Sequence, residues 1–64
     1  MSMPIEELEA LCRRIVHENP RQADAYRQGK SMLGFFVGRV MTETKGTVNP
    51  TQTSGIFRHI MDAQ

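Results

Sequence analysis

Residues 33–41, LGFFVGRVM, form the centre of the most apolar segment in this chain of 64 residues. Their large apolar side chains recur at i, i+3, i+4, i+7 and i+8, the spacing that places one stripe on the core-facing side of a helix. The stripe consists of Leu33, Phe36, Val37, Val40 and Met41. The pattern predicts a helix over about residues 30–44, with Gly46 ending it.

The residues before this segment show the same helical spacing. Over about residues 4–18 the apolar side chains again fall on one stripe, made of Ile5, Leu8, Leu11, Cys12, Ile15 and Val16. Opposite charges stand four residues apart on the other side, Glu9 with Arg13 and Arg14 with Glu18. Such pairs are expected to form on a solvent-facing surface. The segment therefore predicts a first amphipathic helix.

Two Asn-Pro pairs, at residues 19–20 and 49–50, mark the starts of two more helices. Proline suits the first helical position because its φ is already helical and that position needs no N–H donor. The asparagine before it can cap the exposed N–H groups of the first turn. Gln22 and Gln52 stand where a capping box needs a glutamine. We therefore expect both asparagines to be helix caps.

The helices that follow these pairs are predicted over about residues 20–28 and 50–62. In the last one the side chains on one face are Thr53, Ile56, Phe57 and Ile60. Its first turns contain poor helix formers and should be loose without support from the rest of the fold. No segment alternates with a period of two, so no sheet is expected. The predicted fold is one all-α domain over residues 1–64, a compact bundle of three to four short helices.

Composition excludes several classes of protein. A single cysteine excludes an internal disulfide, which is the usage expected of an intracellular chain. The longest strongly apolar run, Met32 to Val37, is far shorter than the ~20 residues of a membrane helix. The acidic start, MSMPIEELE, is unlike a secretory signal. We therefore predict a cytoplasmic protein without a membrane segment.

No constellation of side chains predicts catalysis or metal binding. Cys12 lies in the middle of an apolar stripe and is expected in the core. His17 and His59 have no paired carboxylate and no third ligand at a convincing spacing. We therefore expect no catalytic residue, no metal ligand and no cofactor in this chain. Composition and spacing lead only to a small helical binding or docking module.

Two glycines, Gly34 and Gly38, interrupt the third helix four residues apart. At about 100° per residue they share one flank of the helix with Lys45, to one side of the apolar stripe. Glycine weakens a helix, so its presence there needs a reason. One reason is close packing of another helix, and the other is close approach of a ligand backbone. Phe35 points away from the stripe and is expected to be more exposed.

Positive charge gathers in the middle of the chain. Residues 27–45 carry four cations, Arg27, Lys30, Arg39 and Lys45, against one carboxylate, a balance of +3. Such a basic region can face phosphate groups. A mixed solvated surface explains the same charges equally well.

Three motifs in order resemble one known family. They are ENP at 18–20 with YRQGK at 26–30, LGFFVGRVM at 33–41, and TKGTVNP at 44–50. Together they resemble the GatB/YqeY tail domain, the C-terminal tail of the GatB subunit of the tRNA-dependent amidotransferase. The resemblance spans about residues 5–61. The chain departs from the family pattern at 51–55, TQTSG, where the family usually continues with Leu-Val-like residues.

The resemblance implies a compact all-helical tail that performs no chemistry itself. The parent enzyme amidates Glu-tRNA(Gln) or Asp-tRNA(Asn) with glutamine and ATP. Its nucleotide and Mg²⁺ sites belong to other parts of that enzyme. The tail is expected to grip the outer corner of tRNA(Gln) or tRNA(Asn), as one piece of the amidotransferase complex.

The resemblance and the basic region together single out eight residues as RNA contacts. They are Arg27, Gly29, Lys30, Gly34, Gly38, Arg39, Lys45 and Gly46. In Gly29-Lys30 and Lys45-Gly46 the glycine admits the RNA backbone and the lysine supplies a phosphate contact. Both pairs are also compatible with ordinary helix C-caps. The alternative function is a free-standing helical module that docks onto a protein through Phe35, Met32 and the glycine flank.

Overall fold

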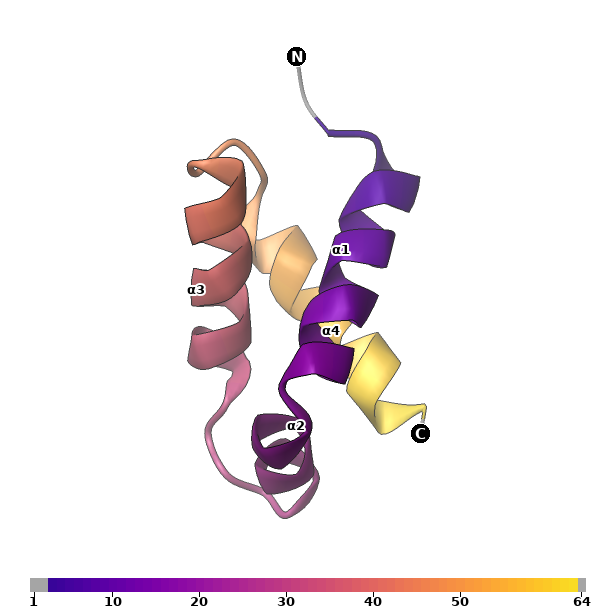
Figure 1. Ribbon diagram of the computed structural model, residues 1–64, viewed down its shortest axis with the longest axis vertical. Helices are drawn as coiled ribbons and strands as arrows, with labels where there is room; N and C mark the ends of the chain where they lie inside the picture. The colour runs from indigo at the N-terminus through magenta and orange to yellow at the C-terminus, as the bar shows by residue number, and fades with distance from the viewer. Residues whose placement is uncertain (1–2, 64) are drawn as a thin grey trace.

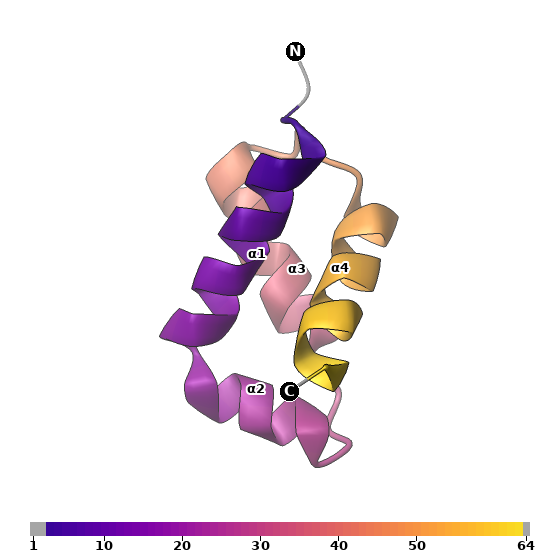
Figure 2. The same cartoon turned by 90° about the vertical axis from the view of Figure 1, so that its right-hand side faces the viewer.

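The computed structural model describes residues 3–63, which form four helices and, within that range, no strand. The helices are α1 (Ile5–Glu18), α2 (Pro20–Arg27), α3 (Leu33–Thr44) and α4 (Pro50–Asp62). α1, α3 and α4 pack against one another, and α2 lies across the lower ends of α1 and α4 (Figures 1 and 2). The predicted all-α bundle is confirmed. No helix among residues 3–63 is both long and apolar enough to cross a membrane.

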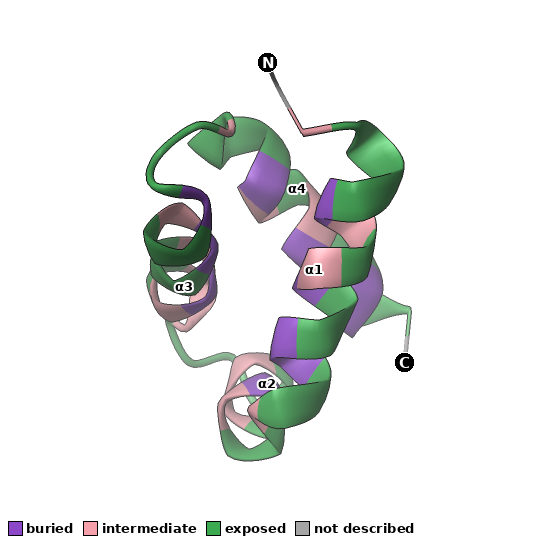
Figure 3. Cartoon of the chain, turned by 45° about the horizontal axis from the view of Figure 1, so that its top comes forward, coloured by how far each residue is buried: buried purple, intermediate pink, exposed green. Residues whose placement is uncertain are grey.

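The core lies where α1, α3 and α4 meet (Figure 3). The rings of Phe36 and Phe57 pack at its centre, with their centroids 5.1 Å apart. The remaining buried apolar side chains are Leu8, Cys12, Ile15, Val16, Ala23, Val40, Ile60 and Met61. At about 0.8 kcal/mol for each buried CH₂ group, this cluster is the main stabilising term of so small a domain.

The predicted apolar stripes are confirmed at their centres and differ at their edges. Ile5 is 42% exposed because it lies in the first turn of α1, beyond the core. Phe35 is partly buried and packs edge-on against Phe36, with ring centroids 5.2 Å apart. The expectation that Phe35 is turned away from the core is therefore wrong. Met61, which the stripe of the last helix did not include, is fully buried.

The two Asn-Pro pairs start helices through different contacts. Asn49 caps α4, since its Oδ1 accepts the Gln52 N–H at 2.9 Å, as predicted. Asn19 makes no side-chain cap to α2, and its Nδ2 donates to the Ile15 carbonyl at 2.8 Å. The predicted cap at Asn19 is therefore wrong. Asn19 directly follows α1, so its side chain satisfies a carbonyl that the end of α1 leaves unpaired.

The third helix begins at Leu33, three residues later than expected. Gly29 has a φ of 90°, which turns the chain out of the helical path. The Gly29 N–H donates to the Tyr26 carbonyl, and the Lys30 N–H donates to the Ala25 carbonyl. These two bonds are the Schellman pattern that ends a helix at a left-handed glycine. A short connection is then needed before α3 can start.

One arginine links α1 to α3. Arg14 donates to Glu43 at 2.6 Å and to Glu18 at 3.1 Å. The expected pair of Arg14 with Glu18 is thus confirmed, whereas Arg13 makes no ion pair with Glu9 or with any other carboxylate of residues 3–63. Both partners of Arg14 are half exposed, so this link contributes no more than about 1 kcal/mol.

Candidate nucleic-acid interface

The C-terminal end of α3 carries a lysine in a conformation that glycine normally supplies. Lys45 has φ 55° and ψ 36°, and Gly46 after it has φ 73°. The Gly46 N–H donates to the Met41 carbonyl at 2.9 Å, and the Lys45 N–H to the Thr42 carbonyl at 3.4 Å. Lys45 therefore occupies the left-handed position of a Schellman turn. The helix turns at Lys45, one residue earlier than the glycine expected to end it.

A lysine at that position has an energetic cost. For a residue with a Cβ atom the left-handed helical conformation is disfavoured by roughly 1–2 kcal/mol. Observed strain of this kind is a reason to ask what the side chain does. Lys45 is exposed, and it makes no ion pair with the carboxylates of residues 3–63. Its ammonium is thus available to a ligand.

A second Lys-Gly pair lies before the other end of α3. Gly29 and Lys30 are both exposed, in the connection that leads from α2 to α3. Like Lys45, Lys30 makes no ion pair within the described chain. The twelve residues of α3 separate the two lysines, and a helix of that length spans about 18 Å. The two pairs can therefore contact separate phosphate groups of one backbone.

The glycine flank between them is open. Apart from the neighbouring residues and the nearby backbone of α3 itself, a Cβ atom built on Gly34 or on Gly38 would meet no atom of the described chain within 4 Å. No helix of residues 3–63 therefore packs closely on these glycines, so close packing within the described chain does not explain them. In Figure 3 the outward side of α3 is accordingly coloured as exposed and intermediate. What remains is a smooth backbone surface that another molecule can approach.

Gly34 also lies in an open groove of about 350 Å³ between α3 and α4. The residues lining the groove are Leu33, Gly34, Val37, Pro50, Thr51, Ser54 and Arg58. Its α4 wall thus offers two hydroxyl groups and a guanidinium, and its α3 wall offers apolar side chains and a bare backbone. Hydroxyl, guanidinium and small apolar groups together suit a sugar-phosphate chain, which has both polar and apolar surface.

Arg39 and Arg27, two of the predicted RNA contacts, differ from each other in their surroundings. Arg39 is exposed on α3 and makes no ion pair within residues 3–63. Arg27 is held in place, because its Nε donates to the Met61 carbonyl at 3.2 Å and its NH1 group pairs with Asp24 at 3.2 Å. Arg27 therefore has a structural task at the junction of α2 and α4.

Arg58, Thr51 and Ser54 were not among the residues expected to bind. They are one face of α4, at the i, i+3, i+7 spacing of a helix, and that spacing could have identified them in the sequence. Nothing in the sequence showed that this face borders Gly34. The polar residues at 51–55, where the chain departs from the family pattern, thus partly form the wall of the groove.

The thiol of Cys12 lies in the core, away from the groove between α3 and α4. Burial raises the pKa of the Cys12 thiol to about 11, with the nearby charge of Glu9 adding to the effect, so the thiol is protonated at neutral pH. No group of three or more His, Cys, Asp or Glu side chains in residues 3–63 is placed to hold a metal ion. The polar side chains that line the groove between α3 and α4 are the hydroxyls of Thr51 and Ser54 and the guanidinium of Arg58.

Comparison with known proteins gives a family match over most of the chain. The family model of the GatB domain matches residues 3–61. The chain is 45% identical over 53 residues to the GatB subunit of the aspartyl/glutamyl-tRNA(Asn/Gln) amidotransferase of Caldanaerobacter subterraneus subsp. tengcongensis, covering 81% of this chain and 11% of that protein. The same subunit of Chlorobaculum tepidum is 44% identical over 57 residues, covering 88% of this chain and 12% of the relative.

A third relative, the corresponding amidotransferase subunit of Coxiella burnetii strain Dugway 5J108-111, is 43% identical over 54 residues, covering 83% of this chain and 11% of the relative. The chain thus spans about a tenth of the length of the curated relatives that it matches. No solved structure matches the chain.

Proposed function

This chain belongs to the GatB domain family, and we propose that it is a tRNA-binding module of an aspartyl/glutamyl-tRNA(Asn/Gln) amidotransferase. In that role it grips the body of tRNA(Gln) or tRNA(Asn) in the cytoplasm while other parts of the enzyme convert the attached Glu or Asp to its amide. Glutamine, ATP and Mg²⁺ serve those other parts. The module itself contributes binding and orientation, with no catalytic residue.

The observation that carries the proposal is the open glycine flank of α3. Gly34 and Gly38 weaken the helix, and no side chain of the described chain lies above them. Close approach of a ligand backbone, the other explanation of the two glycines, fits this open surface. On or beside the same helix, three cations make no ion pair within residues 3–63, namely Lys30, Arg39 and Lys45. Their charge favours a ligand that is negatively charged.

The binding is expected to read the shape of the RNA. Structured RNA is recognised largely through phosphate and 2′-OH groups, and sequence is read mainly from unstacked bases on aromatic side chains. The two aromatic residues outside the centre of the core, Phe35 and Tyr26, are partly buried and pack against it. Thr51, Ser54 and Arg58 supply donors for sugar and phosphate oxygens. The module therefore suits a folded tRNA body.

The alternative, docking onto a protein, has less support. Its expected apolar contacts were Phe35 and Met32 together with the glycine flank. Both side chains are partly buried and pack against the core. The groove still offers Leu33 and Val37 to an apolar partner, and tRNA affinity that does not respond to salt would favour this alternative.

A salt titration of tRNA binding tests the proposal. We expect the affinity of the chain for a tRNA(Gln) transcript to fall steeply with salt, with a log–log slope of roughly −3 when Lys30, Arg39, Lys45 and Arg58 each contact one phosphate group. The double variant Lys30→Ala/Lys45→Ala should reduce the size of that slope by about 2. Arg21→Ala, which removes one exposed charge outside the interface, is the matched control. A slope near zero, or a slope that the double variant leaves unchanged, would contradict the proposal.

A further inference from the structure

The short helix α2 has the smallest share in the core of the four helices. It lies across the lower ends of α1 and α4 (Figure 2), and Ala23 is its one buried side chain. Each of the other three helices buries at least three side chains. A helix of eight residues is also shorter than the roughly 12–15 residues that an isolated helix needs in water. The folded state of α2 therefore depends on a small number of contacts with the rest of the chain.

A hydrogen bond at the end of α4 fastens α2 to that helix. The Arg27 Nε–H donates to the Met61 carbonyl at 3.2 Å, and the partly buried Tyr26 packs against the core. Met61 is the last residue but one of α4, and the terminal turns of helices fray. The attachment of α2 is thus made to a part of α4 that is itself weakly held.

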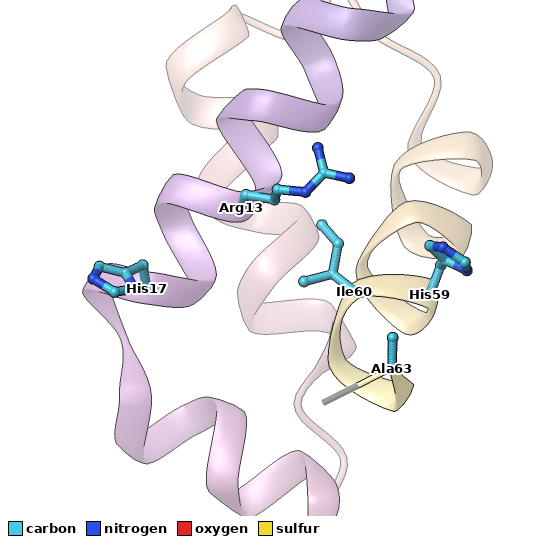
Figure 4. Close-up of a pocket in the computed structure, with 5 residues that line it drawn as sticks. All are labelled: Arg13, His17, His59, Ile60 and Ala63. Atoms are coloured by element: carbon cyan, nitrogen blue, oxygen red, sulfur yellow. The ribbon is translucent and has the colours of Figure 1, made fainter.

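The bundle is also incompletely packed next to α2. A hollow of about 360 Å³ separates the lower parts of α1 and α4, and the rings of His17 and His59 on its two sides point away from each other (Figure 4). The remaining lining consists of Arg13, Ile60 and Ala63. Because this end of the bundle is already open, few closely packed contacts are lost there when α2 moves away.

The chain leaves the helical path on both sides of α2. Asn19, with φ −130° and ψ 60°, separates α2 from α1. Its N–H donates to the Val16 carbonyl and its Nδ2 to the Ile15 carbonyl, so Asn19 is held by α1. On the other side Gly29, with φ 90°, begins the connection to α3. Hinges are formed by a few such residues at the ends of elements, so α2 can move while its neighbours stay helical.

We propose that α2 is a lid that opens as one unit while α1, α3 and α4 stay folded, and that its closure positions Lys30 for RNA. The Gly29 N–H donates to the Tyr26 carbonyl at 2.9 Å, and the Lys30 N–H donates to the Ala25 carbonyl at 3.0 Å. Lys30 is thus tied to the end of α2, whereas Lys45 is tied to the end of α3. The separation of the two lysines is therefore defined only when the lid is closed.

The link to RNA rests on the function proposed above, whereas the opening of the lid does not. A ligand shifts an equilibrium towards the state that it binds more tightly. An RNA backbone that contacts Lys30 and Lys45 together binds the closed state better, because the open state does not hold Lys30 in place. Binding of tRNA should therefore keep α2 closed.

Native-state hydrogen exchange of the 64-residue chain, followed by NMR without RNA, tests the opening. Elements that open locally exchange their amides without global unfolding. We expect the amides of residues 23–28 to be at least about tenfold less protected than those at the centres of the other three helices. Arg27→Ala should lower the protection of α2 severalfold, since it removes the bond to Met61. Arg21→Ala, an exposed change in the same helix, is the matched control.

A variant at the far end of α4 distinguishes local opening from global unfolding. Asn49→Ala removes the cap of α4, and should lower the protection of the core amides roughly fivefold, as is typical of a lost cap. It should leave α2 unchanged, because α4 is capped whether the lid is open or closed. Amides of α2 that are as protected as those of α3, or that lose protection together with them in Asn49→Ala, would overturn the lid.

The same exchange measurement in saturating tRNA(Gln) transcript at low salt tests the link to RNA. We expect tRNA to slow the exchange of α2 at least about threefold, and to slow it less in Lys30→Ala. Bound tRNA that leaves the exchange of α2 unchanged would overturn the link to RNA, although the lid would still open. A chain that shows the opening but binds no tRNA would contradict the function proposed above, so the two failures are distinguishable.

Discussion

Arg27 donates its Nε–H to the main-chain carbonyl of Met61, 3.2 Å away, and so fastens the end of α2 to the last turn of α4. The final carbonyls of a helix have no partner within the helix, and a cation there also interacts favourably with the helix dipole. Asp24 holds the same guanidinium from the other side at 3.2 Å. Arg27 therefore helps to place the short helix α2, whose one buried side chain is Ala23.

Replacing Arg27 should consequently change stability. We expect Arg27→Ala to lower the free energy of unfolding by about 1–2 kcal/mol, because a charge-assisted hydrogen bond to a carbonyl is lost. Arg27→Lys, which keeps the charge without the planar guanidinium, should recover only part of the loss. Urea denaturation monitored by circular dichroism measures both. An unchanged midpoint in Arg27→Ala would show that this contact does not stabilise the fold.

Substitutions at Lys45 can separate the effect of this residue on stability from its effect on tRNA binding. Lys45→Gly should raise the free energy of unfolding by about 0.5–1 kcal/mol, since glycine adopts the left-handed conformation without the Cβ penalty. The same variant should bind tRNA more weakly and reduce the salt slope by about 1. Lys45→Arg should keep both the strain and the binding. If Lys45→Gly binds tRNA as tightly as the wild type, Lys45 is only a helix cap.

Substitutions in the open glycine flank of α3 should also change stability and tRNA binding in opposite directions. Gly34→Leu and Gly38→Leu should each stabilise the fold by about 0.5–1 kcal/mol, because leucine is a better helix former and the added side chain meets open space. Both should weaken tRNA binding by obstructing its approach to α3. Gly55→Ala on α4 is the matched control, since Gly55 is also helical and open but does not line the groove.

Thermal denaturation and tRNA-binding measurements on these three variants test whether RNA approaches the glycine flank of α3. Stabilisation without any loss of affinity in the α3 variants would mean that the RNA does not approach that flank.

The pKa of Cys12 predicts how stability changes in alkali. Because the folded pKa of about 11 lies above the usual thiol value of about 8.5, ionisation favours the unfolded chain between these pH values. Stability should be complete below about pH 8 and fall by on the order of 2 kcal/mol as the pH rises to 11.

Tyr26 contributes with the same sign in the upper part of this range. Its pKa is raised by desolvation and by the neighbouring Asp62 carboxylate, so the measurement is made in a Tyr26→Phe background. Adding Cys12→Ala should lower the overall stability but remove most of the remaining slope. A slope that persists undiminished in the absence of the thiol would contradict this assignment.

Much of the fold could be predicted from local patterns. The stripes around Phe36 and Val40, the Asn49 cap and the all-α class follow from helical spacing and from the chemistry of Asn-Pro. The role of Asn19 could not be predicted, because α1 and α2 meet there and its side chain hydrogen-bonds to the end of α1. The late start of α3 depends on the φ of Gly29, which a glycine allows but does not require.

The sequence predicted several residues of the candidate site, but it did not predict how they are arranged in space. The sequence identified Gly34 and Gly38 as unusual, yet only the fold shows that no helix of residues 3–63 covers them. It placed Arg27 among the cations, and only the fold brings that side chain to the Met61 carbonyl. Arg58 borders Gly34 through the packing of α4 on α3, a contact between distant parts of the chain.

The measurement that tests the central claim most directly is an NMR map of tRNA binding to the labelled chain at low and at moderate salt. We predict that the shifts cluster on Gly29 and Lys30, on the flank of Gly34 and Gly38, and on the Lys45 turn, and that they fade as salt rises. A folded chain whose α3 signals do not move in excess tRNA would contradict the proposal that this helix grips RNA.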